Sequence, residues 1–183
     1  MRKILYLAIT STILFTSCTK NVSGTSGVFI NPLDIETAEE TGFLTPAVVF
    51  FPATAATNVG GGVTLDIHAM EVDSIAGSHI QVSYNKAKLA LLNLSQGTFY
   101  DGAPEMLFYY EDDTNLGLID IYSGFLGVDS SSVSGTGQLA SMVFTTISAG
   151  LSIVTFTVLS EFVDPQDNPI EILGYGVSEV VAE

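Results

Sequence analysis

Positive charge is scarce in this chain of 183 residues, which has 5 lysines and arginines against 20 aspartates and glutamates. Proteins that bind nucleic acids need clustered Lys and Arg to neutralise phosphates, so the composition argues against a nucleic-acid partner. The chain also has no tryptophan and only two histidines. Hydrophobic residues nevertheless make up 47% and charged residues 14%, which predicts a packed core. At this length we expect one folded domain.

Cysteine occurs once, at Cys18, which leaves no disulfide framework and no cysteine-based metal site. The preceding segment has a charged start at Arg2 and Lys3, an apolar run at residues 4–15, and two small polar residues before Cys18. This apolar run is shorter than the roughly 20 residues of a membrane-spanning helix and is typical of a secretory leader.

The leader resembles a bacterial lipoprotein signal peptide. The resemblance implies that residues 1–17 are removed and that Cys18 is lipidated, with export to the outer membrane or cell surface of the envelope. The alternative is an ordinary cleaved leader that happens to contain a cysteine. Residues 18–45 begin with "CTKNVSGTSG", which is typical of a flexible tether. The chain without its leader keeps three lysines and all 20 acids, a formal charge of 3 − 20 = −17.

From residue 46 to residue 183 the pattern is β throughout. Apolar and polar residues alternate in "VTLDIHAM" (63–70), "HIQVSY" (79–84) and "LIDIY" (118–122), as in strands with one buried face. In the last two segments the predicted inward residues are Ile80, Val82, Tyr84, Ile119 and Ile121. About nine short strands and no helical period predict an all-β, antiparallel sandwich or barrel.

Four stretches carry a resemblance to a known family: "VGGGVTLDI", "IQVSYNKAKLALLNLSQG", "GLIDIYSG" and "GTGQLASMVFTTISAGLSIVTF". Their order and spacing resemble a cohesin domain, the scaffold module that captures dockerins in cellulosomes and is related to cellulose-binding modules. The match covers about Val48 to Ile172. It implies a nine-stranded, antiparallel jelly-roll β-sandwich over residues 46–183.

The glycine pair Gly135 and Gly137 is predicted to form a hinge that turns the chain into the following strand, because glycine accepts sharp turns without a side-chain penalty. A phosphate-binding loop is the rival interpretation. It fails because neither a lysine nor a helix start follows the glycines.

Catalytic groups are sparse, so we expect no enzymatic activity. His68 and His79 would form half a metal site if their strands made a hairpin, but the jelly roll places those strands in opposite sheets. Both histidines are then expected to be solvated, with no metal or other cofactor bound. The carboxylates of Asp66, Asp120 and Glu161 are scattered over different strands.

Two acidic turns contain oxygen donors in the manner of calcium loops. The first has Asp113, Asn115 and Gly117 at alternate positions, and the second is "DPQDNP" at Asp164 to Pro169. The first turn lacks the distal bidentate glutamate, so an acidic hairpin turn is the favoured interpretation. Calcium binding is the alternative for both turns.

The cohesin resemblance implies that a dockerin docks on one flat sheet face. Carried over to this chain, that face comprises His79, Gln81, Ser83, Leu118, Asp120 and Tyr122. Its mixture of apolar, aromatic, hydroxyl and acidic groups suits an interface. A merely solvated outer face is the alternative.

Carbohydrate binding is the second functional hypothesis, suggested by the related cellulose-binding modules. The candidate stacking rings are Phe108, Tyr109, Tyr110 and Tyr122, of which alternation turns only some outward. The favoured hypothesis is a lipid-anchored, cohesin-like module that holds a dockerin-bearing protein at the cell envelope during polysaccharide degradation. The alternatives are a glycan-binding lipoprotein, with polysaccharide as the partner, and a structural envelope lipoprotein.

Overall fold

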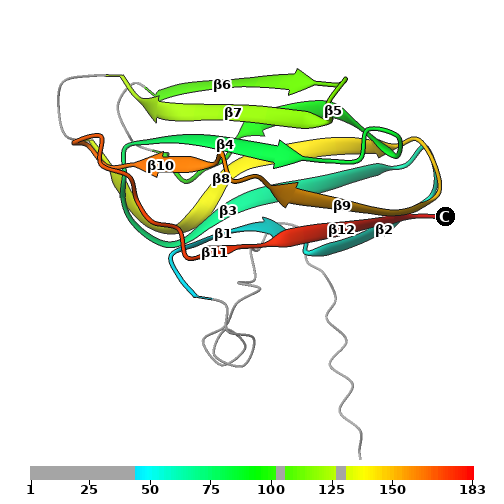
Figure 1. Cartoon of the computed structure of the whole chain (residues 1–183), viewed down its shortest axis with the longest axis horizontal. Helices are drawn as coiled ribbons and strands as arrows, with labels where there is room; N and C mark the ends of the chain where they lie inside the picture. The colour runs from blue at the N-terminus through cyan, green and yellow to red at the C-terminus, as the bar shows by residue number, and fades with distance from the viewer. Residues whose placement is uncertain (1–43, 102–105, 127–130) are drawn as a thin grey trace, which may run out of the picture.

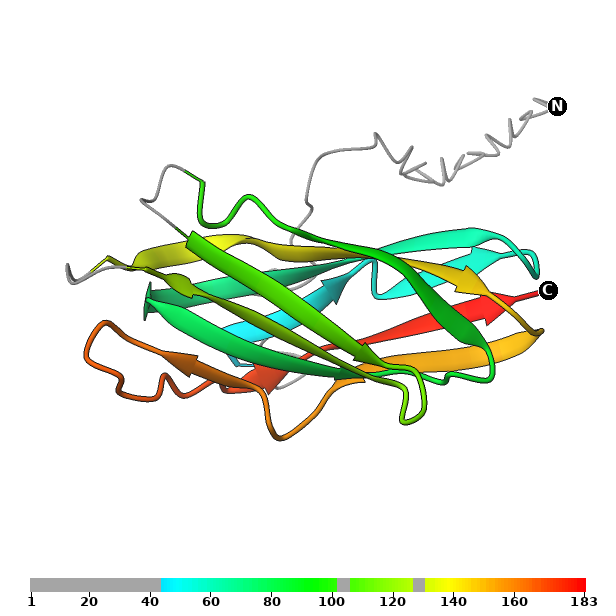
Figure 2. The same cartoon turned by 90° about the horizontal axis from the view of Figure 1, so that it is seen from above.

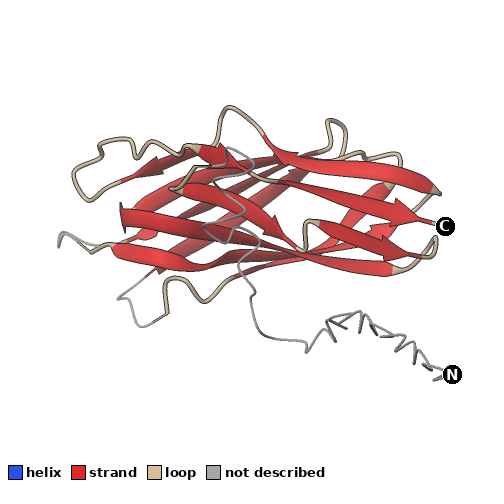
Figure 3. Cartoon of the chain, turned by 90° about the horizontal axis from the view of Figure 1, so that it is seen from below, coloured by secondary structure: helices blue, strands red, loops and turns tan. Residues whose placement is uncertain are grey.

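Two β-sheets pack face to face in the part of the chain that the computed structural model describes, residues 44–101, 106–126 and 131–183 (Figures 1 and 3). Within these ranges every regular element is a strand. Figure 2 separates the layer that holds β3 and β8 from the layer that holds β4 and β12. The leader, Cys18 and most of the predicted tether lie outside the described residues and stay predictions.

The five-stranded sheet, here called sheet A, has the order β11-β1-β3-β8-β5. Its strands are β11 (Gly174–Tyr175), β1 (Ala47–Phe51), β3 (Gly62–Ile75), β8 (Val133–Thr146) and β5 (Leu89–Gln96). The seven-stranded sheet B has the order β2-β12-β9-β4-β7-β6, and β10 pairs with β4 outside this path. Its strands are β2 (Thr54–Thr57), β12 (Val177–Ala182), β9 (Gly150–Phe156), β4 (Gly77–Ser83), β7 (Leu118–Phe125), β6 (Met106–Asp113) and β10 (Glu161–Val163).

The predicted all-β sandwich is confirmed. Among the described residues, nine strands are five or more residues long, and β2, β10 and β11 are shorter additions. Two of these additions pair in parallel, β11 with β1 and β2 with β12, whereas the remaining strand pairs are antiparallel.

The parallel pairs arise because two stretches of chain pass from sheet A to sheet B side by side. Pro52 lies between β1 and β2, and Gly176 lies between β11 and β12. Proline has no N–H for a ladder and therefore interrupts a strand. The two stretches close one side of the sandwich, at the bottom of Figure 1.

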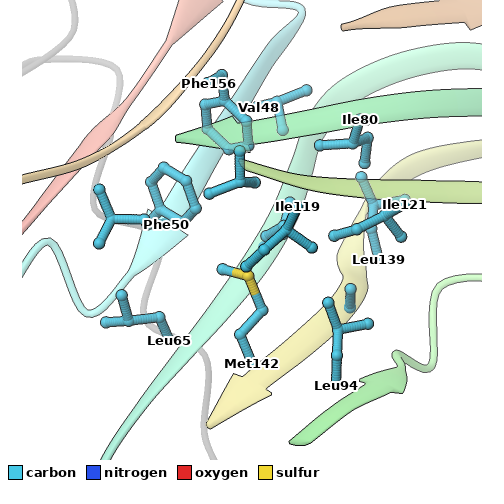
Figure 4. Close-up of a cluster of buried hydrophobic side chains, with 14 of the residues drawn as sticks. Val48, Phe50, Leu65, Ile80, Leu94, Ile119, Ile121, Leu139, Met142 and Phe156 are labelled. Atoms are coloured by element: carbon cyan, nitrogen blue, oxygen red, sulfur yellow. The ribbon is translucent and has the colours of Figure 1, made fainter. Parts of the chain in front are cut away.

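The core forms where the inward faces of the two sheets meet. The predicted inward set is confirmed, since every member is buried: Ile80, Val82, Tyr84, Ile119 and Ile121. Val63, Leu65 and Ile67 of β3 are buried with them. Figure 4 shows side chains from both sheets converging in this cluster. The Phe50 and Phe156 rings stack across it with centroids 4.1 Å apart.

The glycine pair lies inside β8 and is not a hinge before it, so that prediction is wrong. Gly135 has φ of +114° and pairs with Val72 at an irregularity in the β3–β8 register. At Gly137, an added Cβ would lie 2.5 Å from Cδ2 of Phe99. Gly135 therefore allows a backbone conformation that other residues rarely adopt, whereas Gly137 leaves room for the Phe99 ring.

Gly137→Ala should lower the free energy of unfolding by about 1–3 kcal/mol, because the new methyl displaces the buried Phe99 ring. Gly62→Ala is the matched control within a strand, since its Cβ would meet nothing closer than 3.9 Å. Urea denaturation of both variants measures the difference. Equal unfolding midpoints for the two variants would contradict this role of Gly137.

His68 is buried, with 4% of its surface exposed, so the prediction that it is solvated is wrong. It lies on the outward face of sheet A beside a second small buried cluster of Ala47, Val49 and Met70. Its ring meets that of Phe51 edge to face, with centroids 6.3 Å apart. Alternation assigns a residue to one face of a sheet, but it does not say whether that face is covered.

Burial lowers the pKa of His68 from 6.5 to about 4, and the charge of Asp66 opposes this shift only in part. Between these values the unfolded chain binds a proton that the folded chain does not bind, so stability falls as the pH drops. We expect a loss of about 2 kcal/mol between pH 7.5 and pH 5 from this group. Urea denaturation of wild type and His68→Leu at both pH values tests this, and an unchanged pH dependence in the variant would refute it.

Candidate functional site

The six residues of the predicted binding face lie together on the outward side of sheet B. The register of β4 and β7 forms three cross-strand pairs from them: His79 with Tyr122, Gln81 with Asp120, and Ser83 with Leu118. Residues opposite one another in a sheet point to the same side. The intervening Ile80, Val82, Ile119 and Ile121 point into the core, so strand alternation alone turns the six residues outward.

A hydrogen-bonded network holds the polar members of this face in place. Asp120 Oδ1 lies 2.7 Å from His79 Nε2 and accepts a 2.9 Å hydrogen bond from Gln81 Nε2. Thr157, just after β9, donates a 2.8 Å bond to Gln81 Oε1. His79 and Asp120 are partly exposed, whereas Gln81 is buried, so solvent reaches this network through His79 and Asp120.

Three aromatic rings form a row across β4, β7 and β6. His79 and Tyr122 stack with centroids 4.6 Å apart and planes 4° from parallel, and Tyr109 stacks on Tyr122 at 6.3 Å. Tyr109 also donates a 2.7 Å hydrogen bond to Glu111 Oε1, which raises the pKa of its hydroxyl. The spacing of the rings follows the spacing of the strands, about 4.8 Å.

This stacking bears on the carbohydrate hypothesis. The rings face one another across the strands, so the faces of Tyr122 are occupied by its neighbours. A sugar ring needs an exposed aromatic face. The other two candidate rings, Phe108 and Tyr110, pack against the core. Tyr122 therefore presents its ring edge and hydroxyl group, and Tyr109, on the edge strand β6, is the ring of this row with an aromatic neighbour on one face only.

Sequence reasoning missed the part of this surface that β9 and β12 supply. Leu151 and Ile153 of β9 point outward, whereas Ser152 between them is buried. Hydrophobicity alone would place Ser152 in solvent and Leu151 and Ile153 in the core, which is the reverse of what the structure shows. No signal in "GLSIVTF" identifies the exposed pair without the register of the neighbouring strands.

The two acidic turns use their carboxylates internally. Asp113 Oδ1 accepts hydrogen bonds from the N–H groups of Asn115 and Leu116. Asp164 accepts bonds from the side chain and backbone N–H of Asn168, and from the backbone N–H of Gln166, which lower the pKa of its carboxyl group. Within the described ranges no three His, Cys, Asp or Glu residues group as metal ligands. Calcium binding stays the untested alternative to an acidic turn at both sites.

The candidate catalytic groups fall on both sheets, with His68 and Asp66 on sheet A and with His79, Asp120 and Glu161 on adjacent strands of sheet B, where Glu161 of β10 pairs with His79. His68 lies on β3 of sheet A and His79 on β4 of sheet B, as predicted, so the two rings share no site. Asp66, on sheet A, accepts a 2.6 Å hydrogen bond from Ser141, whereas Asp120 faces outward on sheet B. The described part of the chain also contains no helix with the length and apolarity needed to cross a membrane.

No family model matches the sequence, and no curated protein sequence is similar to it. Solved structures are similar in fold. A type II cohesin domain from the cellulosome of Acetivibrio cellulolyticus gives a TM-score of 0.61 at 16% identity, covering 72% of this chain and 92% of that chain. The sixth cohesin of scaffoldin B from the same organism, in complex with a mutant dockerin, gives a TM-score of 0.62 at 17% identity. The match covers 75% of this chain and 96% of that chain.

A non-cellulosomal cohesin from the hyperthermophilic archaeon Archaeoglobus fulgidus gives a TM-score of 0.59 at 18% identity, covering 74% of this chain and 92% of that chain. Each of these cohesins is thus matched over nearly its whole length. At such identities the similarity establishes architecture alone. The sandwich described above has the cohesin fold.

Proposed function

We propose that this protein is a binding module, not an enzyme, and that it captures a dockerin-type protein domain on the outward face of sheet B. The observation that carries the proposal is the network of His79, Gln81 and Asp120, flanked by the Tyr122 and Tyr109 rings. Preordered polar groups beside aromatic side chains are what interfaces use for specificity and affinity.

The cohesin fold supports this choice of partner, since solved cohesins include complexes with dockerins. We further propose that lipidated Cys18 and the tether of residues 18–45 hold the module at the bacterial cell envelope. There it would anchor one dockerin-bearing protein at a time, in the service of polysaccharide degradation. The lipoprotein-like leader and the single cysteine support this location.

The test uses the chain without residues 1–18, immobilised and exposed to an extract of the organism that encodes it. We expect it to capture a dockerin-bearing protein in calcium and to release that protein on chelation, because dockerins resemble paired calcium loops that need the ion to fold. A parallel incubation with insoluble cellulose addresses the carbohydrate alternative. Cellulose binding without any calcium-dependent protein partner would overturn the proposal.

A further inference from the structure

The turn between β9 and β10 takes the place of a paired strand beside Gln81. Strand β4 pairs with β9 at Val82 and Ser83, and with β10 as far as His79, so neither strand pairs with Gln81. Figure 1 shows β9 and β10 on the same side of β4, one beyond the other. Residues 157–160 join them. This turn therefore lies beside the residue at the middle of the polar network.

The turn holds the backbone of Gln81 at both of its polar groups. The Thr157 N–H donates to the Gln81 carbonyl at 2.9 Å, and the Gln81 N–H donates to Ser160 Oγ at 3.1 Å. Within the turn, the Ser160 N–H donates to the Thr157 carbonyl at 3.2 Å. These bonds replace the missing strand ladder, so the position of Thr157 relative to Gln81 is fixed.

The side-chain hydrogen bonds from this turn run in one direction. Thr157 Oγ1 accepts from the Leu159 N–H at 3.2 Å and donates its own hydrogen to Gln81 Oε1 at 2.8 Å. The other end of the Gln81 amide, Nε2, donates to Asp120 Oδ1 at 2.9 Å. The reversed amide would set Gln81 Oε1 against the carboxylate, two acceptors with no hydrogen between them. Thr157 and Asp120 thus select the same orientation of the amide.

The same direction extends to His79. A carboxylate has no hydrogen to donate, so the hydrogen of the 2.7 Å contact with Asp120 Oδ1 belongs to His79 Nε2. In the neutral ring, Nδ1 then keeps an unshared electron pair. Asp120 Oδ1 accepts from both neighbours, and no residue in the described ranges bonds to Asp120 Oδ2 or His79 Nδ1.

The two open atoms are accessible acceptors. Neither Asp120 Oδ2 nor His79 Nδ1 is one of the buried side-chain atoms that lack a hydrogen-bond partner, and both residues are partly exposed. The atoms of a partner that match them are therefore N–H or O–H donors.

Burial makes the Thr157 hydroxyl important to this arrangement. Gln81 is 9% exposed, so water replaces a lost partner of its side chain poorly. Without the hydroxyl, Gln81 Oε1 either stays buried and unsatisfied or the side chain turns away from Asp120. In the second case Asp120 loses one of the two bonds that orient its carboxylate.

We propose that Thr157 is a positioning residue of the binding face. Its hydroxyl holds the Gln81 amide, and the amide holds the Asp120 carboxylate with Oδ2 open to a donor of the partner. This inference rests on the proposed function and adds to the face a residue that alternation along β4 and β7 does not identify.

The first measurement needs no partner. In the chain without residues 1–18, NMR should show the two Gln81 side-chain amide protons as separate signals that exchange slowly with water. Thr157→Val keeps the shape of the side chain without its hydroxyl, and it should speed this exchange about tenfold or more. Thr157→Ser keeps the hydroxyl and should retain the slow exchange. Unchanged Gln81 signals in Thr157→Val would overturn the inference.

The second measurement is affinity for recombinant, calcium-loaded dockerin domains from the organism that encodes the chain. Thr157→Val should weaken binding about tenfold, whereas Thr157→Ser should bind within about twofold of wild type. The control is Thr145→Val, a half-buried threonine on β8 of sheet A. It should bind as wild type does. Equal losses in Thr157→Val and Thr157→Ser would show that the hydroxyl is not the cause and would overturn the positioning role.

The outcomes separate the two proposals. If a dockerin binds wild type and Thr157→Val with equal affinity, the positioning role is overturned and the proposed function stands. If no dockerin binds wild type, the proposed function is overturned, and the role of Thr157 in binding with it. Circular dichroism of every variant excludes unfolding as the cause of a loss.

Discussion

Tyr122→Ala should weaken binding of a calcium-loaded dockerin by at least about 30-fold while the domain stays folded. Tyr122 is the middle ring of the row, stacked on His79 at 4.6 Å and on Tyr109 at 6.3 Å. Its loss removes contact area at the centre of the face. It also removes the support that orients His79 toward Asp120, so the polar network loses its order as well.

The control for this variant is Tyr175→Ala. Tyr175 is 40% exposed and Tyr122 is 38% exposed, but Tyr175 belongs to β11 in sheet A. Isothermal titration calorimetry with one dockerin compares both variants with wild type. If the two substitutions weaken binding equally, the effect comes from general loss of an aromatic ring, and the row is not the binding site.

Leu65→Ala should lower the free energy of unfolding by about 3–5 kcal/mol. Leu65 is fully buried on β3, where the inward faces of the two sheets meet. Removing its side chain costs the transfer free energy of the lost atoms and leaves a cavity that a packed sandwich cannot close.

Leu92→Ala removes the same atoms from a position that is 63% exposed, on β5 of the same sheet. We expect it to change the free energy of unfolding by less than about 0.5 kcal/mol. Urea denaturation monitored by tyrosine fluorescence gives both values. A comparable loss in the two variants would mean that the core does not lie between the sheets as described.

Much of the site could be predicted because a strand has a side-chain period of two. Once Ile80 and Val82 are assigned to the core, His79, Gln81 and Ser83 must face the other way. The cohesin resemblance then assigned β4 and β7 to one face, and their register brings the six predicted residues together. Their role in binding stays a prediction.

The network itself could not be predicted, because its bonds join residues far apart in the sequence. Gln81 bonds to Asp120 and to Thr157, which are 39 and 76 positions away. The stacked row joins three separate strands in the same way. Such contacts depend on which strands are neighbours, and alternation within a single strand contains no information about neighbours.

His68 and Ser152 illustrate the same limit. Alternation correctly assigned His68 to the face opposite Leu65, but that face is buried at this point of sheet A. Ser152 points inward while Leu151 and Ile153 point outward, against their hydrophobicity. In both cases the environment of the face, and not the residue type, decides exposure.

By itself, the sequence determined the longer strands, the all-β class and the inward residues of β4 and β7, since these follow from local alternation and from the turn residues between strands. Only the tertiary structure decided that the exposed Leu151 and Ile153 of β9 lie on the same side of sheet B as the six predicted residues. The physical reason is that a surface is a property of adjacent strands. Their order in a sheet results from packing across the whole domain.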